Sequence, residues 1–202
     1  MKAAMTGNDW QLAMLLNGGA NIQQEDAEGW TALMYAVRYQ NNTQIVKQLI
    51  DGGANTQGKQ RGKLSPLLIA ALYSQNPAIL SLLLEQRSGS EEEVFHAFII
   101  SLTSTECPEF IRLEKSRVFL QLSVPINGMW HGMTPLMYAC HYGDSIDLVA
   151  QLLQYGARTD IYDSTGKTAF DYAKGNASLP HNDIYWSLNS GSNKAAAWEE
   201  YE

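Results

Sequence analysis

The chain has 202 residues, of which 45% are hydrophobic and 17% charged, a composition that excludes disorder for most of its length and predicts a folded domain with a sizeable core. Its net charge of -7 repels phosphate backbones and excludes nucleic acid as a partner. Cys107 and Cys140 are too few for a disulfide framework, and no apolar run approaches the ~20 residues that span a bilayer, so we expect a soluble domain without covalent staples.

The N-terminal segment MKAAMTGNDW lacks the apolar core of a signal peptide. Within it, AAMTG at 3–7 matches ACHYG at 139–143, which indicates that the chain begins inside a first helix. Either the first unit is trimmed, or upstream residues, including a cleaved export signal, are absent. The expected location is cytoplasmic by default, and exported or periplasmic if such a signal was removed.

Four six-residue words recur along the chain, and their spacing predicts a repeat. They are TALMYA at 31–36, SPLLIA at 65–70, TPLMYA at 134–139 and TAFDYA at 168–173. Successive words begin 34, 69 and 34 residues apart, so the period is 34 and one copy is hidden in the middle. A second marker, a Gly-Ala pair after an apolar run, has the same phase at Gly19, Gly53 and Gly156.

Each word has the residues that begin a helix. A hydroxyl residue opens it as a candidate N-cap, and Pro66 and Pro135 stand at the first helical position. A second apolar helix follows, as in IVKQLI at 45–50, ILSLLL at 79–84 and IDLVAQLL at 146–153, and a left-handed glycine ends it. One pair of short helices cannot enclose a core, so we predict an all-α solenoid of stacked pairs.

The hidden fourth copy is expected at 91–127 in a degenerate form. SEEE at 90–93 is a capping box, whose serine is the N-cap and whose last glutamate reaches back to it. Pro108 then opens a second helix that ends near SVPIN at 123–127. Because this copy has lost its turn glycines, we expect a local distortion of the stack and a long loop, SLTSTECP at 101–108, between its helices.

The C-terminal part divides into a closing helix and a tail. NASLPHNDIYWSLN at 176–189 is the predicted closing helix, with Tyr185, Trp186 and Leu188 covering the last exposed core face. Residues 190–202 are small and polar, then acidic and aromatic. We expect a tail that is disordered or vector-derived, with an ordered segment docking on a neighbour as the alternative.

These words resemble ankyrin repeats, whose signature combines T-P-L-H-x-A with L-L-x-x-G-A and a Gly-x-Thr turn. The turn here is DAEGWT at 26–31, WHGMT at 130–134 and DSTGKT at 163–168. The resemblance covers roughly residues 3–188 and implies one ankyrin-repeat domain, 1–189. It implies five to six helix-turn-helix repeats, at about 1–24, 25–57, 58–90, 91–127, 128–160 and 161–189. The family's usual histidine is replaced here by Met34, Leu68, Met137 and Asp171. The replacement affects the hydrogen bond that the histidine makes to the threonine, but not the packing.

Motifs that suggest chemistry are better explained as parts of the repeat. Cys140 and His141 are neighbours on a helix, where side chains point about 100° apart, so no nucleophile–base pair is expected and Cys140 is interpreted as core. STGKTA at 164–169 lacks the earlier glycine of a phosphate-binding loop. KQRGK at 59–63 is interpreted as solvated charge, with an acidic patch on a partner as the alternative. Metal and cofactor are not expected, because zinc-ligand spacing is missing at His96, His131, His141 and His181.

In the ankyrin architecture, turn tips and first helices form one concave surface, and the resemblance carries this surface over position by position. The residues placed there are Glu28, Trp30, Arg38 and Tyr39 in the second repeat, Gln60, Arg61, Leu72 and Tyr73 in the third, and Trp130, His131, Met133, His141 and Tyr142 in the fifth. Trp, Tyr, Met and Arg are enriched in protein interfaces, whereas an idle surface is rich in Lys, Glu and Ser. The alternative is that these rings only pack against adjacent turns.

The resemblance implies a non-enzymatic, monomeric protein that binds a partner protein on this surface, as bacterial ankyrin proteins do. Alternatives within that class are an adaptor, and an inhibitor or self-protection (immunity) protein that blocks a partner enzyme. From another class, the remote alternative is an enzyme or ligand site in the irregular fourth repeat, around His96, Cys107 and Glu109. Hydroxylation of a turn asparagine, known in animal ankyrin proteins, fits only Asn127.

Overall fold

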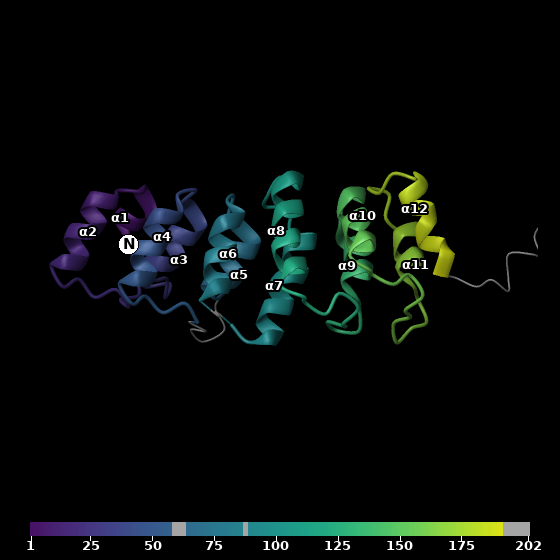
Figure 1. The fold of residues 1–202 in the computed structure, drawn as a ribbon, viewed down its shortest axis with the longest axis horizontal. Helices are drawn as coiled ribbons and strands as arrows, with labels where there is room; N and C mark the ends of the chain where they lie inside the picture. The colour runs from purple at the N-terminus through teal and green to yellow at the C-terminus, as the bar shows by residue number, and fades with distance from the viewer. Residues whose placement is uncertain (58–63, 87–88, 192–202) are drawn as a thin grey trace, which may run out of the picture. The chain divides into compact units, whose positions relative to one another are not determined.

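The computed structural model describes residues 1–57, 64–86 and 89–191, and Figure 1 shows their helices in colour. In these ranges the fold is all-α, as predicted, and the strand-like structure there is an isolated bridge between Trp130 and Met133. None of the described helices is long and apolar enough to cross a membrane. The helices are α1 Lys2–Thr6, α2 Asp9–Asn17, α3 Ala32–Tyr39, α4 Thr43–Asp51, α5 Pro66–Tyr73, α6 Pro77–Glu85, α7 Glu91–Thr103, α8 Glu109–Gln121, α9 Pro135–Tyr142, α10 Ile146–Gln154, α11 Ala169–Lys174 and α12 Asp183–Ser187, with a final 3-10 turn at Leu188–Gly191.

Contacts within the chain divide it into two compact units. Unit 1 comprises Met1–Ser101 with Thr105–Val118, and unit 2 comprises Leu102–Ser104 with Phe119–Glu202. In unit 1, α1 packs on α3 and α3 on α5, while α2 packs on α4 and α4 on α6. In unit 2, α9 packs on α11 and α10 on α12. This stacking of first helix on first helix and second on second is the arrangement predicted for short helical pairs that share a core.

The core of each unit consists of the apolar residues that recur along its helices. Side chains from first and second helices are fully buried, among them Leu33, Ile45, Leu49, Leu67, Leu80 and Leu83 in unit 1 and Leu136, Leu148, Val149 and Leu152 in unit 2. Removing such a side chain from water stabilises the fold by roughly 1.5–3 kcal/mol. The sequence spacing that predicted the helices therefore also predicts which faces are buried.

The predicted N-caps are confirmed. The hydroxyl oxygens of Thr31, Ser65, Thr134 and Thr168 each accept a hydrogen bond from the backbone N–H three residues on, over 3.2–3.3 Å. The residues that replace the family's histidine differ in the hydrogen bonds that they accept from the N-cap residue. The Asp171 carboxylate accepts from both the Thr168 N–H and its hydroxyl at 2.8 Å, and the Met137 sulfur accepts from the Thr134 N–H at 3.4 Å. Two repeats thus keep a reciprocal cap through other side chains.

The hairpins between repeats are tied by side-chain amides. Gln23 donates to the carbonyl of Gly53 at 2.6 Å and accepts from the Asn55 N–H at 3.1 Å. Asn127 makes the same pair of bonds, donating to the Gly156 carbonyl at 3.1 Å and accepting from the Arg158 N–H at 2.8 Å. Both glycines are left-handed, as predicted. Asn127, the one asparagine that fitted the hydroxylation pattern, therefore joins two consecutive hairpins within unit 2.

The fourth helical pair departs from the prediction in its length. Helix α7 runs through Thr103, so the loop is 104–108 and the expected loop at 101–108 is wrong. The reason is visible at Ser101, which is fully buried and donates its hydroxyl to the Phe98 carbonyl inside the helix at 2.7 Å. At the other end, Ser90 accepts from the Glu93 N–H at 3.2 Å, which confirms its capping role.

Where the first, second and fifth repeats place a glycine two residues after their second helix, the fourth places a serine. Ser123 has φ 57, in the left-handed region that glycine occupies at equivalent positions, such as Gly156 with φ 90. Glycine enters this region without a Cβ penalty, whereas other L-residues are strained there by roughly 1–2 kcal/mol. The fourth repeat therefore keeps the left-handed turn of the fifth repeat without the residue type that favours it.

The closing helix is shorter than predicted. Helix α12 begins after Asn182, whose side chain accepts from the Tyr185 N–H, so the expected start at 176 is wrong. Tyr185 and Leu188 are buried, as predicted, whereas Trp186 is 55% exposed and contacts the core through the buried Phe170 ring, with the ring centres 6.2 Å apart. The tail predicted at 190–202 lies almost entirely outside the described residues, as does the basic cluster at 59–63.

Candidate functional site

In unit 1, the predicted surface residues form a cluster around one guanidinium group. The Arg38 guanidinium lies 4.0 Å from the centre of the Tyr73 ring, 5.3 Å from that of Tyr39 and 5.6 Å from that of Trp30. Tyr73 belongs to the next repeat, so two repeats hold this side chain. No hydrogen bond or ion pair joins Arg38 to another described residue. Its N–H donors are held in place by rings and remain available to an acceptor.

A buttress of Tyr35 and Asp26 supports this cluster from behind. The Tyr35 ring lies 5.3 Å from Trp30 and stacks on Tyr39 at 6.3 Å. Its hydroxyl donates to one Asp26 oxygen at 2.6 Å, and the other oxygen accepts the N–H groups of Glu28 and Trp30. The hydrogen bond to Asp26, with burial, raises the pKa of Tyr35 to about 12. The turn that carries Glu28 and Trp30 is therefore fixed to the helix that carries Arg38.

The same buttress recurs in unit 2. Tyr172 donates to Asp163 at 2.5 Å, and a second Asp163 oxygen accepts the N–H groups of Thr165 and Lys167. The bond to Tyr172 holds the pKa of Asp163 well below its usual range, and the same bond raises the pKa of Tyr172 to about 12. Sequence reasoning missed both pairs. The signal was an Asp five residues before the hydroxyl cap with a Tyr four residues after it.

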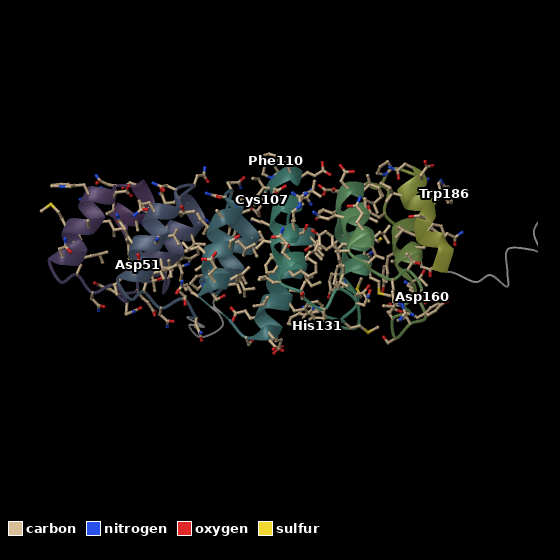
Figure 2. All side chains as sticks on the ribbon, viewed as in Figure 1. Asp51, Cys107, Phe110, His131, Asp160 and Trp186 are labelled. Atoms are coloured by element: carbon tan, nitrogen blue, oxygen red, sulfur yellow. The ribbon has the colours of Figure 1, made fainter. Side chains whose placement is uncertain are left out.

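The predicted residues of the fifth repeat also come together, within unit 2. Trp130 and Met133 exchange two backbone hydrogen bonds, of 2.9 and 3.0 Å, which close the turn and place His131 at its tip with φ 48. The Trp130 and His131 rings meet edge to face at 4.9 Å. Figure 2 shows His131 among the loops below α9 in this view. This turn is stiffened by its backbone and by the Tyr138 hydroxyl, which donates to the Trp130 carbonyl at 3.0 Å.

Next to the turn of the fifth repeat, aromatic side chains of α9 and α11 contact one another within unit 2. His141 on α9 lies 4.2 Å from Tyr142 and 4.9 Å from Tyr172 of α11, and Tyr138 stacks on Tyr142 at 6.0 Å. The Lys167 ammonium lies 5.4 Å from the Tyr172 ring. Tyr142 is 58% exposed. Tyr172 and Lys167 are additions to the predicted set, brought in by the next repeat.

Every predicted surface residue that the structure describes is exposed or half-buried. Glu28, Tyr39, His131, His141 and Tyr142 are exposed, and Trp30, Arg38, Tyr73, Trp130 and Met133 are half-buried. Arg61, with Gln60, lies outside the described residues. The rings contact one another, as the alternative interpretation expected, yet keep free area. We call the residues Trp30, Arg38, Tyr39 and Tyr73 the Arg38 cluster, and Trp130, His131, His141, Tyr142 and Tyr172 the His141 cluster.

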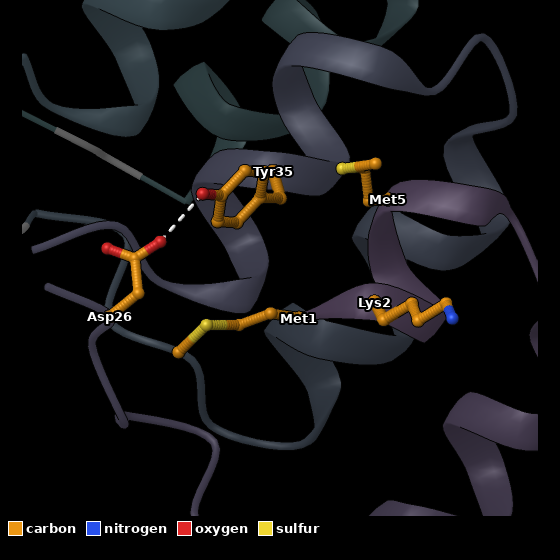
Figure 3. Close-up of a pocket in the computed structure, with 5 residues that line it drawn as sticks. All are labelled: Met1, Lys2, Met5, Asp26 and Tyr35. Carbon is orange, nitrogen blue, oxygen red and sulfur yellow. Dashed lines mark hydrogen bonds between the residues drawn. The ribbon is translucent and has the colours of Figure 1, made fainter. Parts of the chain in front are cut away.

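An apolar cavity of about 310 Å³ adjoins the buttress of unit 1. Figure 3 shows its lining residues, Met1, Lys2, Met5, Asp26 and Tyr35, with the Tyr35 hydroxyl directed at Asp26 and the Lys2 ammonium directed away from both. Apart from the Tyr35–Asp26 pair, which is already engaged, the lining consists of thioethers and alkyl chain. The cavity extends the apolar surface beside the Arg38 cluster.

Little in the described residues supports catalysis. No group of three His, Cys, Asp or Glu side chains within them is arranged to hold a metal ion. Cys140 is fully buried, and burial raises the pKa of its thiol to about 12, so it is a poor nucleophile, whereas His141 is exposed. In the fourth repeat, Glu109 is exposed and Cys107 is buried against the amine of Lys115, a residue that sequence reasoning missed.

Comparisons with known proteins agree with this fold. A family model of ankyrin repeats in three copies matches residues 1–94, and a single ankyrin repeat matches residues 131–164. Comparison with the curated proteins finds no match.

Two solved structures are similar over nearly the whole chain. One is a chain of the complex between the predatory endopeptidase Bd0816 from Bdellovibrio bacteriovorus and its immunity protein Bd3460, with a TM-score of 0.69, 21% identity, and coverage of 93% of this chain and 95% of that one. The other is the ankyrin repeat domain of Bcl-3, of the IkappaB protein family, with a TM-score of 0.70, 21% identity, and coverage of 94% and 84%. The two family matches together span more than half of the sequence, and the capped helical pairs stack in register. The chain belongs to the ankyrin repeat family.

Proposed function

We propose that this chain is a non-enzymatic binding protein that holds a partner protein on the Arg38 and His141 clusters. The observation that carries the proposal is the Arg38 guanidinium, which three rings hold in place and which no described side chain neutralises. A side chain fixed before binding loses little rotamer entropy when a partner arrives. Arg, Trp and Tyr are also the residues at which binding energy concentrates.

The experiment compares the immobilised chain with matched variants in capturing partners from a lysate of the cells that encode it. Arg38→Ala removes the guanidinium and should lose the partner, whereas Arg117→Ala removes an exposed arginine that pairs with Glu114 on α8 and should retain it. Trp30→Ala combined with Trp130→Ala tests both turns together. If all variants retain the same partner at wild-type amounts, the proposed surface is wrong.

Within this class, the solved complex of an endopeptidase with its immunity protein favours an inhibitor or self-protection protein as a second candidate. At 21% identity that likeness concerns the fold. The two roles separate by stoichiometry. An inhibitor abolishes the turnover of its captured enzyme at one equivalent, whereas an adaptor leaves turnover intact and engages two proteins at once.

We also propose that the chain is a monomer and that it does not bind nucleic acid. The net charge of -7 supports the second point, since an acidic surface repels phosphates. Sedimentation analysis over a range of concentrations tests the first point. Titration with double-stranded DNA and with RNA at low salt tests the second, because low salt favours any electrostatic binding.

A further inference from the structure

An amine and a thiol meet in the interior of unit 1, at the end of α5. Lys115 on α8 is fully buried, and its Nζ donates to the Ala71 carbonyl at 2.9 Å and to the Cys107 sulfur at 3.2 Å. Cys107, in the loop before α8, is 4% exposed. Its sulfur lies 3.4 Å from the carbonyl oxygens of Leu72 and Ser74. The pair thus occupies the last turn of α5, where helix carbonyls need donors.

The surroundings of Lys115 favour its neutral, nucleophilic form. No carboxylate forms an ion pair with Lys115 among the described residues. Burial lowers the pKa of Lys115, and the neighbouring Cys107 opposes the shift without cancelling it. A lysine with a depressed pKa spends more time as the neutral amine, which is the form that attacks electrophiles.

We propose that Cys107 and Lys115 form a peroxide-sensitive modification site, in which oxidation of the thiol joins its sulfur to the lysine nitrogen. In the first step the sulfur attacks a peroxide oxygen, the O–O bond breaks, and Cys-SH plus H2O2 gives Cys-SOH plus H2O. In the second step the neutral Lys115 amine attacks the sulfenic sulfur, the S–O bond breaks, and water leaves with one amine proton. The product is a sulfenamide, Cys-S–NH-Lys. Two thiols of an external reductant return it to Cys-SH and Lys-NH2 and become a disulfide.

One exposed side chain covers the sulfur. The Gln75 amide donates to Cys107 at 3.5 Å, and also to the carbonyls of Tyr73 and Glu106 at 3.4 and 3.3 Å. The hydrogen bonds to the two carbonyls are long and Gln75 is exposed, so we expect this cover to open to a molecule the size of peroxide. Figure 2 shows Cys107 close to the exposed Phe110, at the start of α8.

The S–N bond would act on the last turn of α5. Closing the 3.2 Å contact to a covalent bond displaces groups that touch Ala71, Leu72 and Ser74. Tyr73 stands among these residues and carries the Arg38 guanidinium on its ring. Oxidation is therefore expected to alter the Arg38 cluster, although the modification itself does not depend on the proposed binding function.

The test uses the full chain carrying Cys140→Ala, which excludes an intramolecular disulfide. After treatment with hydrogen peroxide, the intact mass should fall by about 2 Da and return on addition of dithiothreitol. Trypsin should then release residues 88–112 joined to residues 113–117, because the modified lysine is not cleaved. Loss of cleavage at Lys115 and a linked peptide identify the bond in a chain that keeps both native residues.

Three variants complete the test. In Lys115→Met the mass loss should disappear and Cys107 should instead be trapped as a sulfenic acid by dimedone, while Gln75→Ala should react severalfold faster. Circular dichroism checks that each variant is folded. The proposal is overturned if Cys107 stays unreacted, if it advances to sulfinic acid without a linked peptide, or if the mass loss persists in Lys115→Met.

Discussion

Replacing Ser123 with glycine should stabilise the protein, because Ser123 is strained in a turn that other repeats build with glycine. Its φ of 57 lies in the left-handed region. Glycine would relieve the strain of an L-residue there, which is roughly 1–2 kcal/mol. The greater conformational freedom of glycine in the unfolded chain offsets roughly 0.5–1 kcal/mol of that gain. Ser123 is exposed and its side chain makes no hydrogen bond within the described residues, so nothing else is lost. The expected gain is about 0.5–1 kcal/mol.

The reciprocal variant, Gly156→Ser, makes the opposite change at the equivalent place in the same unit. Gly156 has φ 90, and an added Cβ there meets no atom within 4 Å, so its effect isolates backbone strain from steric clash. Stability should fall by about 1 kcal/mol. A substitution that acted through the side chain alone would not reverse in sign between the two positions.

Urea unfolding followed by circular dichroism measures both effects, as shifts of the midpoint at unchanged slope. Because repeat proteins can unfold in parts, hydrogen exchange of the Leu122 and Ser123 amides localises the change to the end of α8. These amides donate to Phe119 and Leu120 at 3.0 and 3.4 Å. If Ser123→Gly leaves the midpoint unchanged or lowers it, the left-handed assignment and the equivalence with Gly156 are refuted.

Three further predictions concern a helix cap, a buttress and a hairpin tie. Hydrogen bonds from Lys174 and then from the Thr168 N–H lower the pKa of Asp171 from 3.8 to about 2, so the ionised form of Asp171 stabilises the fold. This stabilisation should be complete above pH 4 and should be lost as the pH falls through about 2. Thermal unfolding at each pH should show a less steep loss in Asp171→Asn. The raised pKa of Tyr35 predicts that its phenol ionises near pH 12 in the folded chain and near 10 after unfolding, so Tyr35→Phe should remove one late group from the ultraviolet titration, and an unchanged late phase would contradict the Asp26 pairing. Asn127→Ala should destabilise the chain by about 1–2 kcal/mol because it removes two hydrogen bonds, with Asn41→Ala at an exposed position between α3 and α4 as a comparison expected to have a smaller effect on urea unfolding.

The regular repeats could be predicted from sequence because their signals are local and recur. Thr31 and Thr168 stand immediately before helices that begin where expected, and Gly53 and Gly156 end helices in the left-handed conformation. A hydroxyl cap or a left-handed glycine is decided by a few neighbouring residues, which the sequence displays directly. Periodicity then confirms each signal several times.

The irregular parts were missed because tertiary partners decide them. Asn176 looked like the start of a helix, but its amide donates to the Cys140 and Gly143 carbonyls of the preceding repeat. No prediction was made for Lys115, and its acceptor, the Ala71 carbonyl, lies 44 residues earlier in the sequence. No window of sequence around either residue contains these partners, so only the folded chain reveals them.

The sequence predicted which residues belong to the Arg38 and His141 clusters, but not how their side chains contact one another. Family resemblance placed Arg38 and Tyr73 on one surface, whereas the ring-held guanidinium depends on distances between consecutive repeats. The aspartate–tyrosine pairs behind the turns were overlooked because Asp26 and Asp163 are ordinary turn residues when read alone. Their role depends on Tyr35 and Tyr172, nine residues later, whose hydroxyls donate to the two carboxylates.

The boundary between the two compact units falls inside α7 and α8, so both units draw on the same two helices. A protein engineer who wished to express either half alone would find no cut site that spares both. The useful fragments are overlapping ones, 1–121 and 91–191, because each keeps α7 and α8 whole.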